Sequence, residues 1–195
     1  MRRLSGQGLM EDLGLPYFRN ISTFGALSDA TIVHLVSRGE VLALDAGDVL
    51  FEAGEPSDGF YVIIKGQLAF DKYHEGRYAF IRNYQSGENI GFVGMIALHR
   101  RIGRARAEEE VFVVKIPSGL FHGLYESDTQ DFALLLMNLA RDMARGIRAV
   151  DNLIVAQHQS DQQAPAIRSD CAADAQASPS AGRYASGSSK PAKMH

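Results

Sequence analysis

AGDVLFEAGEPSDGFYVIIKG, residues 46–66, is the segment of this 195-residue chain that says most about its architecture. Its glycines are Gly47, Gly54, Gly59 and Gly66. Between them lie two apolar segments, Val49–Phe51 and Phe60–Ile64. Glycine supplies the positive φ of tight turns, and β-branched and aromatic residues favour strands. The segment therefore predicts short strands joined by tight turns.

The same pattern continues on both sides of residues 46–66. The other strand-like segments are Val41–Leu44, Gln67–Phe70, Tyr78–Ile81 and Val111–Val114. Turn-forming residues separate them. Many short strands with Gly-rich turns predict an antiparallel β-roll or jelly roll. Its inward-facing apolar residues are expected to supply most of the stability.

Helical patterns flank the strands. Ser28 is a good N-cap for a short helix that ends near Val36 and buries Ile32 and Leu35 on one face. Residues 1–15 are Gly-rich and are expected to be irregular. The first 23 residues are interpreted as an N-terminal extension of the domain.

A long helix, about residues 129–157, is predicted after the strands, with Asp128 or Thr129 as its cap. Its apolar stripe is Phe132, Leu136, Leu139, Met143, Ile147, Val150 and Ile154. The first half should pack on the β-roll. The second half narrows to a seam that suits a partner helix in a two-stranded coiled coil, so residues 132–157 predict a homodimer. The alternative is that the seam lies on its own domain.

Composition limits the class of protein. The net charge is −3 at pH 7, and Cys171 is the only cysteine. No apolar run approaches the ~20 residues of a membrane span. A cytoplasmic protein is the simplest interpretation. We expect one domain over residues 24–158, followed by a disordered Ser/Ala/Gly-rich tail over residues 159–195.

The segment most informative for function is GENIGFVGMIALHRRIGRARA, residues 87–107. Three closely spaced glycines lead into a short apolar segment, and a cluster of basic residues follows. Glycine permits close approach of a ligand, and arginine grips an anion with a fork of donors. This arrangement predicts an anion cradle, most simply for a phosphate.

The order of elements resembles the cyclic nucleotide-binding domain family over about residues 24–154. The glycines of residues 46–66 lie where that family's β-roll turns. The family's phosphate cassette reads Phe-Gly-Glu, then a short apolar helix, then an Arg nine positions after the Glu. Here Ile90-Gly91-Phe92 stands in place of Phe-Gly-Glu, and Arg101 follows Phe92 by nine positions.

The resemblance implies a role for each cassette residue. Arg101 would bind phosphate, while backbone N–H groups of Gly91, Val93 and Gly94 would line the site. Phe92, in place of the ribose-binding Glu, would stack on a base or fill the ribose space. Ile102 stands where nucleotide binders often carry a Ser or Thr. The alternative for Arg101 is a structural ion pair with Glu88 or with one of Glu108, Glu109 and Glu110.

These features predict a small sensor protein that binds a cyclic nucleotide such as cyclic AMP, or a related phosphate-bearing ligand, and signals through its C-terminal helix to a protein partner. The alternative is an interaction and dimerisation module whose pocket no longer binds cyclic nucleotide. The six histidines show no metal-ligand spacing and no catalytic motif is present, so an enzyme is not expected. No cofactor and no direct DNA binding are expected either.

Overall fold

The computed structural model describes residues 1–163, except for the side chains of residues 157 and 160–163. Met1–Asp151 form one compact unit. The described part of the second unit, which begins at Asn152, continues the helix that starts at Thr129. The predicted disordered tail lies outside the described residues from residue 164 onward, while its first five residues, 159–163, are helical.

The N-terminal region is more regular than expected. It contains β1 (Arg2–Leu4), α1 (Gly6–Leu13), α2 (Leu15–Arg19), a 3-10 turn (Ser22–Phe24) and α3 (Asp29–Arg38). The prediction that residues 1–15 are irregular is therefore wrong. β1 pairs with the strand that carries Leu42, and the Ser5 hydroxyl caps α1 by accepting from the Gly8 N–H. The predicted N-cap of α3 is confirmed, because the Ser28 side chain accepts from the Thr31 N–H at 3.2 Å.

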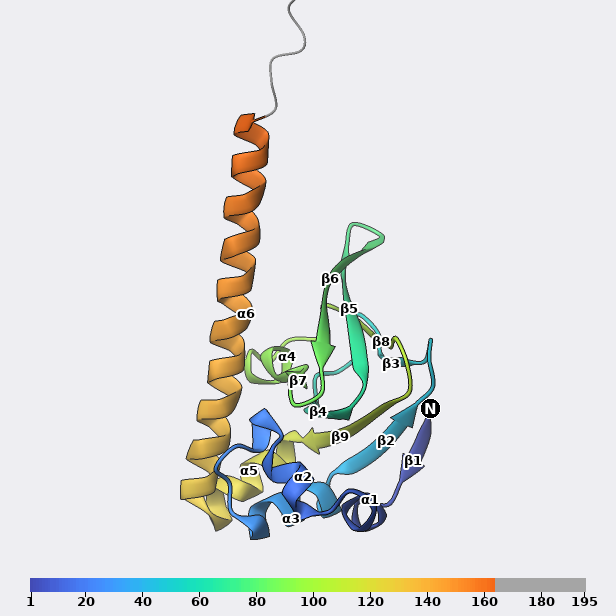
Figure 1. Cartoon of the computed structure of the whole chain (residues 1–195), viewed down its shortest axis with the longest axis vertical. Helices are drawn as coiled ribbons and strands as arrows, with labels where there is room; N and C mark the ends of the chain where they lie inside the picture. Colours follow the sequence, from blue (N-terminus) through green and yellow to red (C-terminus); the bar gives the residue numbers. More distant parts are fainter. Residues whose placement is uncertain (164–195) are drawn as a thin grey trace, which may run out of the picture. The chain divides into compact units, whose positions relative to one another are not determined.

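Eight further strands form the β-roll. They are β2 (Glu40–Leu44), β3 (Val49–Phe51), β4 (Gly59–Lys65), β5 (Gln67–His74), β6 (Arg77–Gln85), β7 (Asn89–Ile90), β8 (Gly103–Ala107) and β9 (Val111–Pro117). One sheet has the order β1-β2-β9-β4-β7, and the other has the order β3-β8-β5-β6 (Figure 1). Every pairing among these strands is antiparallel. The predicted antiparallel β-roll is confirmed.

Three helices follow or interrupt the strands: α4 (Phe92–Ile96), α5 (Ser118–Ser127) and α6 (Thr129–Gln163). Asp128 caps α6, since its carboxylate accepts from the Asp131 N–H at 3.0 Å. α6 therefore begins as predicted and runs six residues past the predicted end. Among the described residues, no helix has the length and hydropathy that crossing a bilayer requires.

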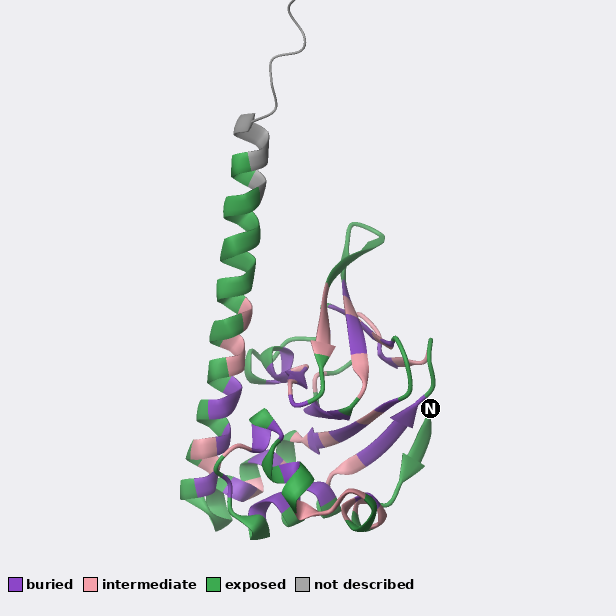
Figure 2. Cartoon of the chain, viewed as in Figure 1, coloured by how far each residue is buried: buried purple, intermediate pink, exposed green. Residues whose placement is uncertain are grey.

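The apolar residues form two cores on opposite faces of the first sheet. Alternation along β4 separates them: Phe60, Val62 and Ile64 face the helices, whereas Tyr61 and Ile63 face the second sheet. We call these the helix-side core and the inter-sheet core. Purple, buried segments in Figure 2 follow both. Because β4 is buried on both faces, its sequence is a continuous apolar run rather than an alternating one.

Burial along α6 changes with position. Leu135 and Leu139 are fully buried in the helix-side core, while Leu136, which the predicted stripe includes, is 36% exposed. Farther along, Ile147 is 61% exposed and Val150 is 46% exposed. Neither residue belongs to the helix-side or the inter-sheet core, so the alternative that the seam packs on its own domain is not borne out for them. The dimer itself stays a prediction.

Candidate functional site

The cassette begins where β7 passes into α4. Gly91 caps α4 in the left-handed region, with a φ of 90°. A Cβ built at this position would lie 2.3 Å from Nη1 of Arg101. Gly91 is thus required twice, for its backbone angle and for the space that the guanidinium occupies.

Arg101 is the central charged residue of the site. It is only 5% exposed, and its Nη1 and Nη2 groups donate to the carbonyls of Gly91 (2.9 Å) and Gly59 (2.7 Å). The guanidinium carbon lies 4.6 Å from the ring centroid of Phe51 and 5.6 Å from that of Tyr61. Its Nε has no hydrogen-bond partner among the described residues. Burial lowers the pKa of Arg101 from its ordinary value.

The predicted alternative for Arg101, a structural ion pair, is wrong. Glu88 pairs with Arg82 at 2.9 Å, and Glu108 pairs with Arg106 at 2.8 Å. In the part of the chain that the structure describes, no carboxylate oxygen lies within 4.0 Å of the Arg101 guanidinium. Arg101 is thus a buried cation that donates to two carbonyls but forms no ion pair within residues 1–163. Part of the desolvation cost of its guanidinium therefore remains without compensation.

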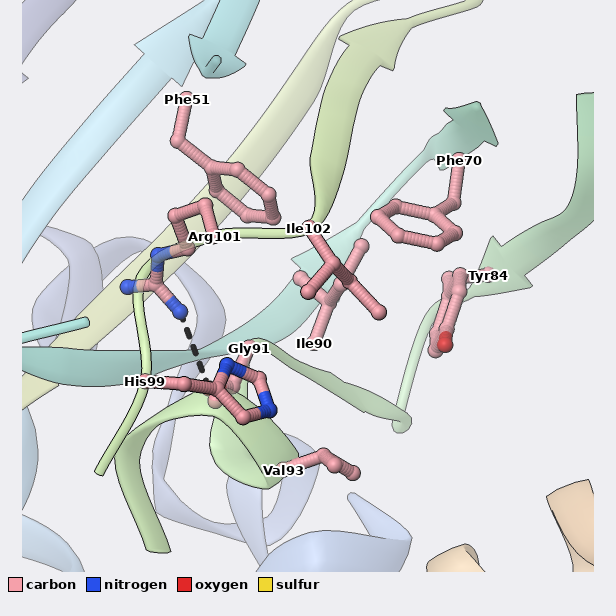
Figure 3. Close-up of a pocket in the computed structure, with 10 residues that line it drawn as sticks. Phe51, Phe70, Tyr84, Ile90, Gly91, Val93, His99, Arg101 and Ile102 are labelled. Atoms are coloured by element: carbon pink, nitrogen blue, oxygen red, sulfur yellow. Dashed lines mark hydrogen bonds between the residues drawn. The ribbon is translucent and has the colours of Figure 1, made fainter. Parts of the chain in front are cut away.

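A cavity of about 160 Å³ opens beside Arg101. Its lining residues are Phe51, Phe70, Tyr84, Ile90, Gly91, Val93, Gly94, His99, Arg101 and Ile102 (Figure 3). Beside it, the buried Ser57 hydroxyl also has no partner within residues 1–163, and a Cβ at Gly94 would lie 2.6 Å from this oxygen. These two polar groups therefore lie at or next to one cavity, as expected of a ligand site.

The structure brings five of the six predicted ligand residues to this cavity: Gly91, Val93, Gly94, Arg101 and Ile102. The sixth, Phe92, does not line the cavity, so its predicted role in ligand binding is wrong. Its ring is 3% exposed and packs in the helix-side core, 5.5 Å from the ring of Phe60 and 6.0 Å from that of Phe121. As an apolar first residue of α4, it gains more by packing among aromatic rings than by facing a cavity that water reaches.

Sequence reasoning missed the other half of the lining. Phe51, Phe70, Tyr84 and Ile90 come from β3, β5, β6 and β7, and His99 comes from the loop after α4. Phe70 belonged to a predicted strand whose inward face was assigned to packing, whereas Tyr84 lies three residues beyond the predicted segment Tyr78–Ile81, in the part of β6 that the sequence did not reveal. Only the pairing of β5 with both β6 and β8 shows that they border a cavity.

Two contacts join the cassette to α6. The Asn89 amide donates to the Asp142 carboxylate at 2.6 Å. A row of aromatic rings also runs from Phe92 to Phe121 at 6.0 Å, and from Phe121 to Phe132 of α6 at 4.9 Å. Asn89 and Phe92 flank the cavity residues Ile90 and Gly91. A shift of residues 89–92 would therefore change both contacts with α6.

Comparison with known proteins is consistent with this geometry. The model of the cyclic nucleotide-binding domain family matches residues 41–128. A cyclic nucleotide-binding domain from Methylobacillus flagellatus superposes with a TM-score of 0.69 at 19% identity, over 80% of this chain and 88% of the other. The catabolite activator protein of Thermus thermophilus gives 0.59 at 19% identity, over 70% of this chain and 63% of its own.

A curated relative is a lysophospholipase NTE1 from Pyricularia oryzae, 28% identical over 120 residues. The match covers 61% of this chain but only 8% of the relative, so the chain spans less than a tenth of that protein's length. The two-sheet roll, the cassette with its buried arginine and the family match agree. Residues 41–128 are therefore a cyclic nucleotide-binding domain.

Proposed function

We propose that this protein is a non-catalytic sensor that binds a small phosphate-bearing ligand in the cavity beside Arg101 and signals through α6. Cyclic nucleotides such as cyclic AMP are the first ligands to test, because the domain family is named for them. The observation that carries the proposal is the state of Arg101: 5% exposed, bordering a cavity, and without an anionic partner among residues 1–163.

The free-energy cost of burying the Arg101 guanidinium explains why an anion would bind beside it. Burial without a direct ion pair penalises the guanidinium. Its two carbonyl hydrogen bonds and the more distant carboxylates of Asp58 and Glu55 offset that penalty only in part. A phosphate at the cavity end of Arg101 would supply the missing charge. It would accept charge-assisted hydrogen bonds, which are about twice as strong as neutral ones. Gly91 and Gly94 leave room for such an approach.

Signalling would use the contacts between the cassette and α6. A ligand that prefers one position of Ile90–Gly91 biases the Asn89–Asp142 hydrogen bond and the packing of Phe92 on Phe121. The exposed seam residues Ile147 and Val150 would pass that bias to a second copy or to a protein partner. We place this sensor in the cytoplasm. The activity in the lysophospholipases' name is not transferred, because the match covers 8% of their length.

Isothermal titration calorimetry with a panel of phosphate-bearing small molecules, headed by cyclic AMP and cyclic GMP, tests the proposal. At least one member should bind, and Arg101→Gln should weaken it about tenfold or more, the loss of a charge-assisted hydrogen bond. Arg106→Gln is the matched control, since Arg106 pairs with Glu108 and does not border the cavity. No binding at millimolar concentration, or equal binding by Arg101→Gln, would overturn it.

One observation favours the second candidate, an interaction module without ligand. Among the described residues, no carboxylate borders the cavity to accept a ribose hydroxyl, and Ile102 brings no hydroxyl of its own. If the whole panel fails to bind while sedimentation shows a dimer, the module is favoured. Its expected degenerate pocket, filled by Phe92 and Ile102, differs from the structure, where Phe92 lies outside the cavity and Ile102 is 47% exposed.

A further inference from the structure

The cavity beside Arg101 has an unusual balance of lining groups for a nucleotide site. Among the described residues that line it, Arg101 and His99 are the only side chains that can carry charge, apart from the phenol of Tyr84. The rest of the lining is apolar or glycine. A ribose brings hydroxyl groups that need acceptors, and burying them unpaired weakens binding. The lining suits an anionic ligand whose remaining part is apolar.

The size of the cavity further limits the range of candidate ligands. Its volume is about 160 Å³. An engineered apolar cavity of about 150 Å³ takes up benzene. Pockets for drug-sized ligands begin at about 300 Å³. The space therefore matches one aromatic ring with a small substituent, and a purine, a ribose and a phosphate together would extend past the half-exposed Val93 and Ile102.

The lining is also divided into two ends. In Figure 3 the guanidinium of Arg101 lies on one side of Ile90 and Ile102, and the rings of Phe70 and Tyr84 lie on the other. These rings meet edge to face, with centroids 6.2 Å apart. One end therefore offers the guanidinium of Arg101, and the other offers aromatic surface.

The aromatic end is held in place by its neighbours. The Arg82 guanidinium lies 3.6 Å from the ring centroid of Tyr84 and pairs with Glu88. Arg82 therefore already forms an ion pair with a carboxylate, whereas Arg101 forms none among the described residues. The cation free to receive an anion is the one at the opposite end from the aromatic pair, among the residues that line the cavity.

We propose that the cavity selects a small aromatic anion: a single ring that carries a phosphate or a carboxylate. The oxyanion meets Arg101, whose planar fork matches both groups, and the ring packs between Ile90, Ile102 and the pair Phe70–Tyr84. This inference rests on the proposed function, because it assumes that the cavity is a ligand site. It goes beyond it by assigning the ligand a body without ribose.

Competition and calorimetry with four probes test the proposal on the full chain. The probes are phenyl phosphate, cyclic AMP, inorganic phosphate and phenol. Phenyl phosphate should bind about tenfold or more tightly than each of the other three, since each lacks the ring, lacks the charge or brings a ribose. Benzoate should compete with phenyl phosphate and thereby show whether the phosphorus is needed.

Variants separate the two ends of the cavity. Arg101→Lys and Arg101→Gln should weaken phenyl phosphate but leave phenol unchanged. Phe70→Leu should weaken phenyl phosphate and leave inorganic phosphate unchanged. Phe80→Leu, on β6 with a ring 61% exposed and outside the cavity, is the matched aromatic control and should bind as wild type. Thermal unfolding of each variant confirms that it is folded.

The outcomes are distinguishable. Cyclic AMP binding more tightly than phenyl phosphate, with both lost in Arg101→Gln, would overturn this inference and leave the proposed function standing. Phenol binding as tightly as phenyl phosphate, or Phe70→Leu binding phenyl phosphate as wild type, would also overturn it. Failure of all four probes, together with the phosphate panel, would remove the proposed function itself.

Discussion

Arg101 and Phe92 occupy opposite faces of the same cassette, nine residues apart, and the structure uses them differently. Arg101 borders the cavity between α4 and the second sheet, while Phe92 is buried in the helix-side core. The family spacing predicted both in the ligand site. A cation cannot join an apolar core without a partner, whereas a phenylalanine can, and that difference in solvation divides the two faces.

This division gives each face its own task. The cavity face, with Gly91 and Arg101, provides space and charge for a ligand. The core face, with Phe92 against Phe121, connects α4 to α5 and then to α6. Substitutions on the core face should therefore act first on stability, and substitutions on the cavity face should act first on binding.

The largest expected effect is on the core face. Phe92→Ala should lower the free energy of unfolding by about 3–5 kcal/mol, the usual cost of a cavity left by a buried ring. Urea denaturation followed by circular dichroism measures it. Ile102→Ala is the control on the cavity face and should cost under about 1 kcal/mol, because Ile102 is half exposed. Equal losses in the two variants would mean that the faces are not distinct.

Gly91→Ala is expected to come next. It forces a positive φ on alanine and places a Cβ against the Arg101 guanidinium. Together these should cost about 2–3 kcal/mol. Gly47→Ala separates the two causes, since Gly47 has a φ of 89° but a Cβ there would meet no described atom within 4 Å. Gly91→Ala should be the more destabilising of the two and should also weaken ligand binding, and equal costs would exclude the clash with Arg101.

The base of α6 offers a pH-dependent test of the core side. Asp131 accepts from the Ser28 hydroxyl at 2.6 Å and from the Ser28 N–H at 3.1 Å. Burial raises the pKa of Asp131, but these hydrogen bonds and one with Thr31 outweigh it, so the pKa lies below its ordinary value. A lowered folded-state pKa stabilises the protein above the unfolded-state value of about 3.9, and this gain is lost as pH falls through the folded pKa.

Asp131→Asn should therefore destabilise the protein by about 1–3 kcal/mol at neutral pH, the scale of hydrogen bonds to a charged group. The gap between wild type and variant should shrink as the pH drops below about 4. Chemical denaturation at a series of pH values measures this gap. A gap that is constant with pH would contradict the role of the ionised carboxylate.

The smallest effect on monomer stability is expected at the exposed seam. Ile147→Asp should change the free energy of unfolding of Met1–Asp151 by no more than about 0.5 kcal/mol, because Ile147 is 61% exposed. The same change should dissociate a dimer built on this seam. Analytical ultracentrifugation reads the mass, with the exposed Arg148→Asp as a control for added negative charge. A wild-type protein that is monomeric at high concentration would contradict the dimer.

The sequence predicted much of the fold because the signals were local. The continuous apolar run Phe60–Ile64 is a strand, Ser28 caps α3, and Gly47, Gly54 and Gly66 have the positive φ of tight turns, as short-range geometry predicted. Gly59 instead begins β4. The N-terminal strand was missed because Arg2–Leu4 has no apolar alternation and is exposed along its length. It is a strand only because β2 offers an edge to pair with.

The site was less predictable because its residues come together through tertiary pairing. Arg101 followed from its spacing to Gly91. The aromatic end did not, since Phe70 and Tyr84 are brought to the cavity by the register of β5 on β6. The inward turn of Phe92 depends on Phe60 and Phe121, which are 32 and 29 residues away in the chain and invisible to any local pattern.

One measurement tests the division between the two faces most directly: titration calorimetry of Arg101→Gln and the conservative Phe92→Leu side by side, with phenyl phosphate and cyclic AMP as probes. Phe92→Leu should keep the Kd of the tighter probe within about threefold of wild type, while Arg101→Gln should raise it about tenfold or more. Loss of binding in Phe92→Leu equal to that in Arg101→Gln, or wild-type binding in both, would contradict the account.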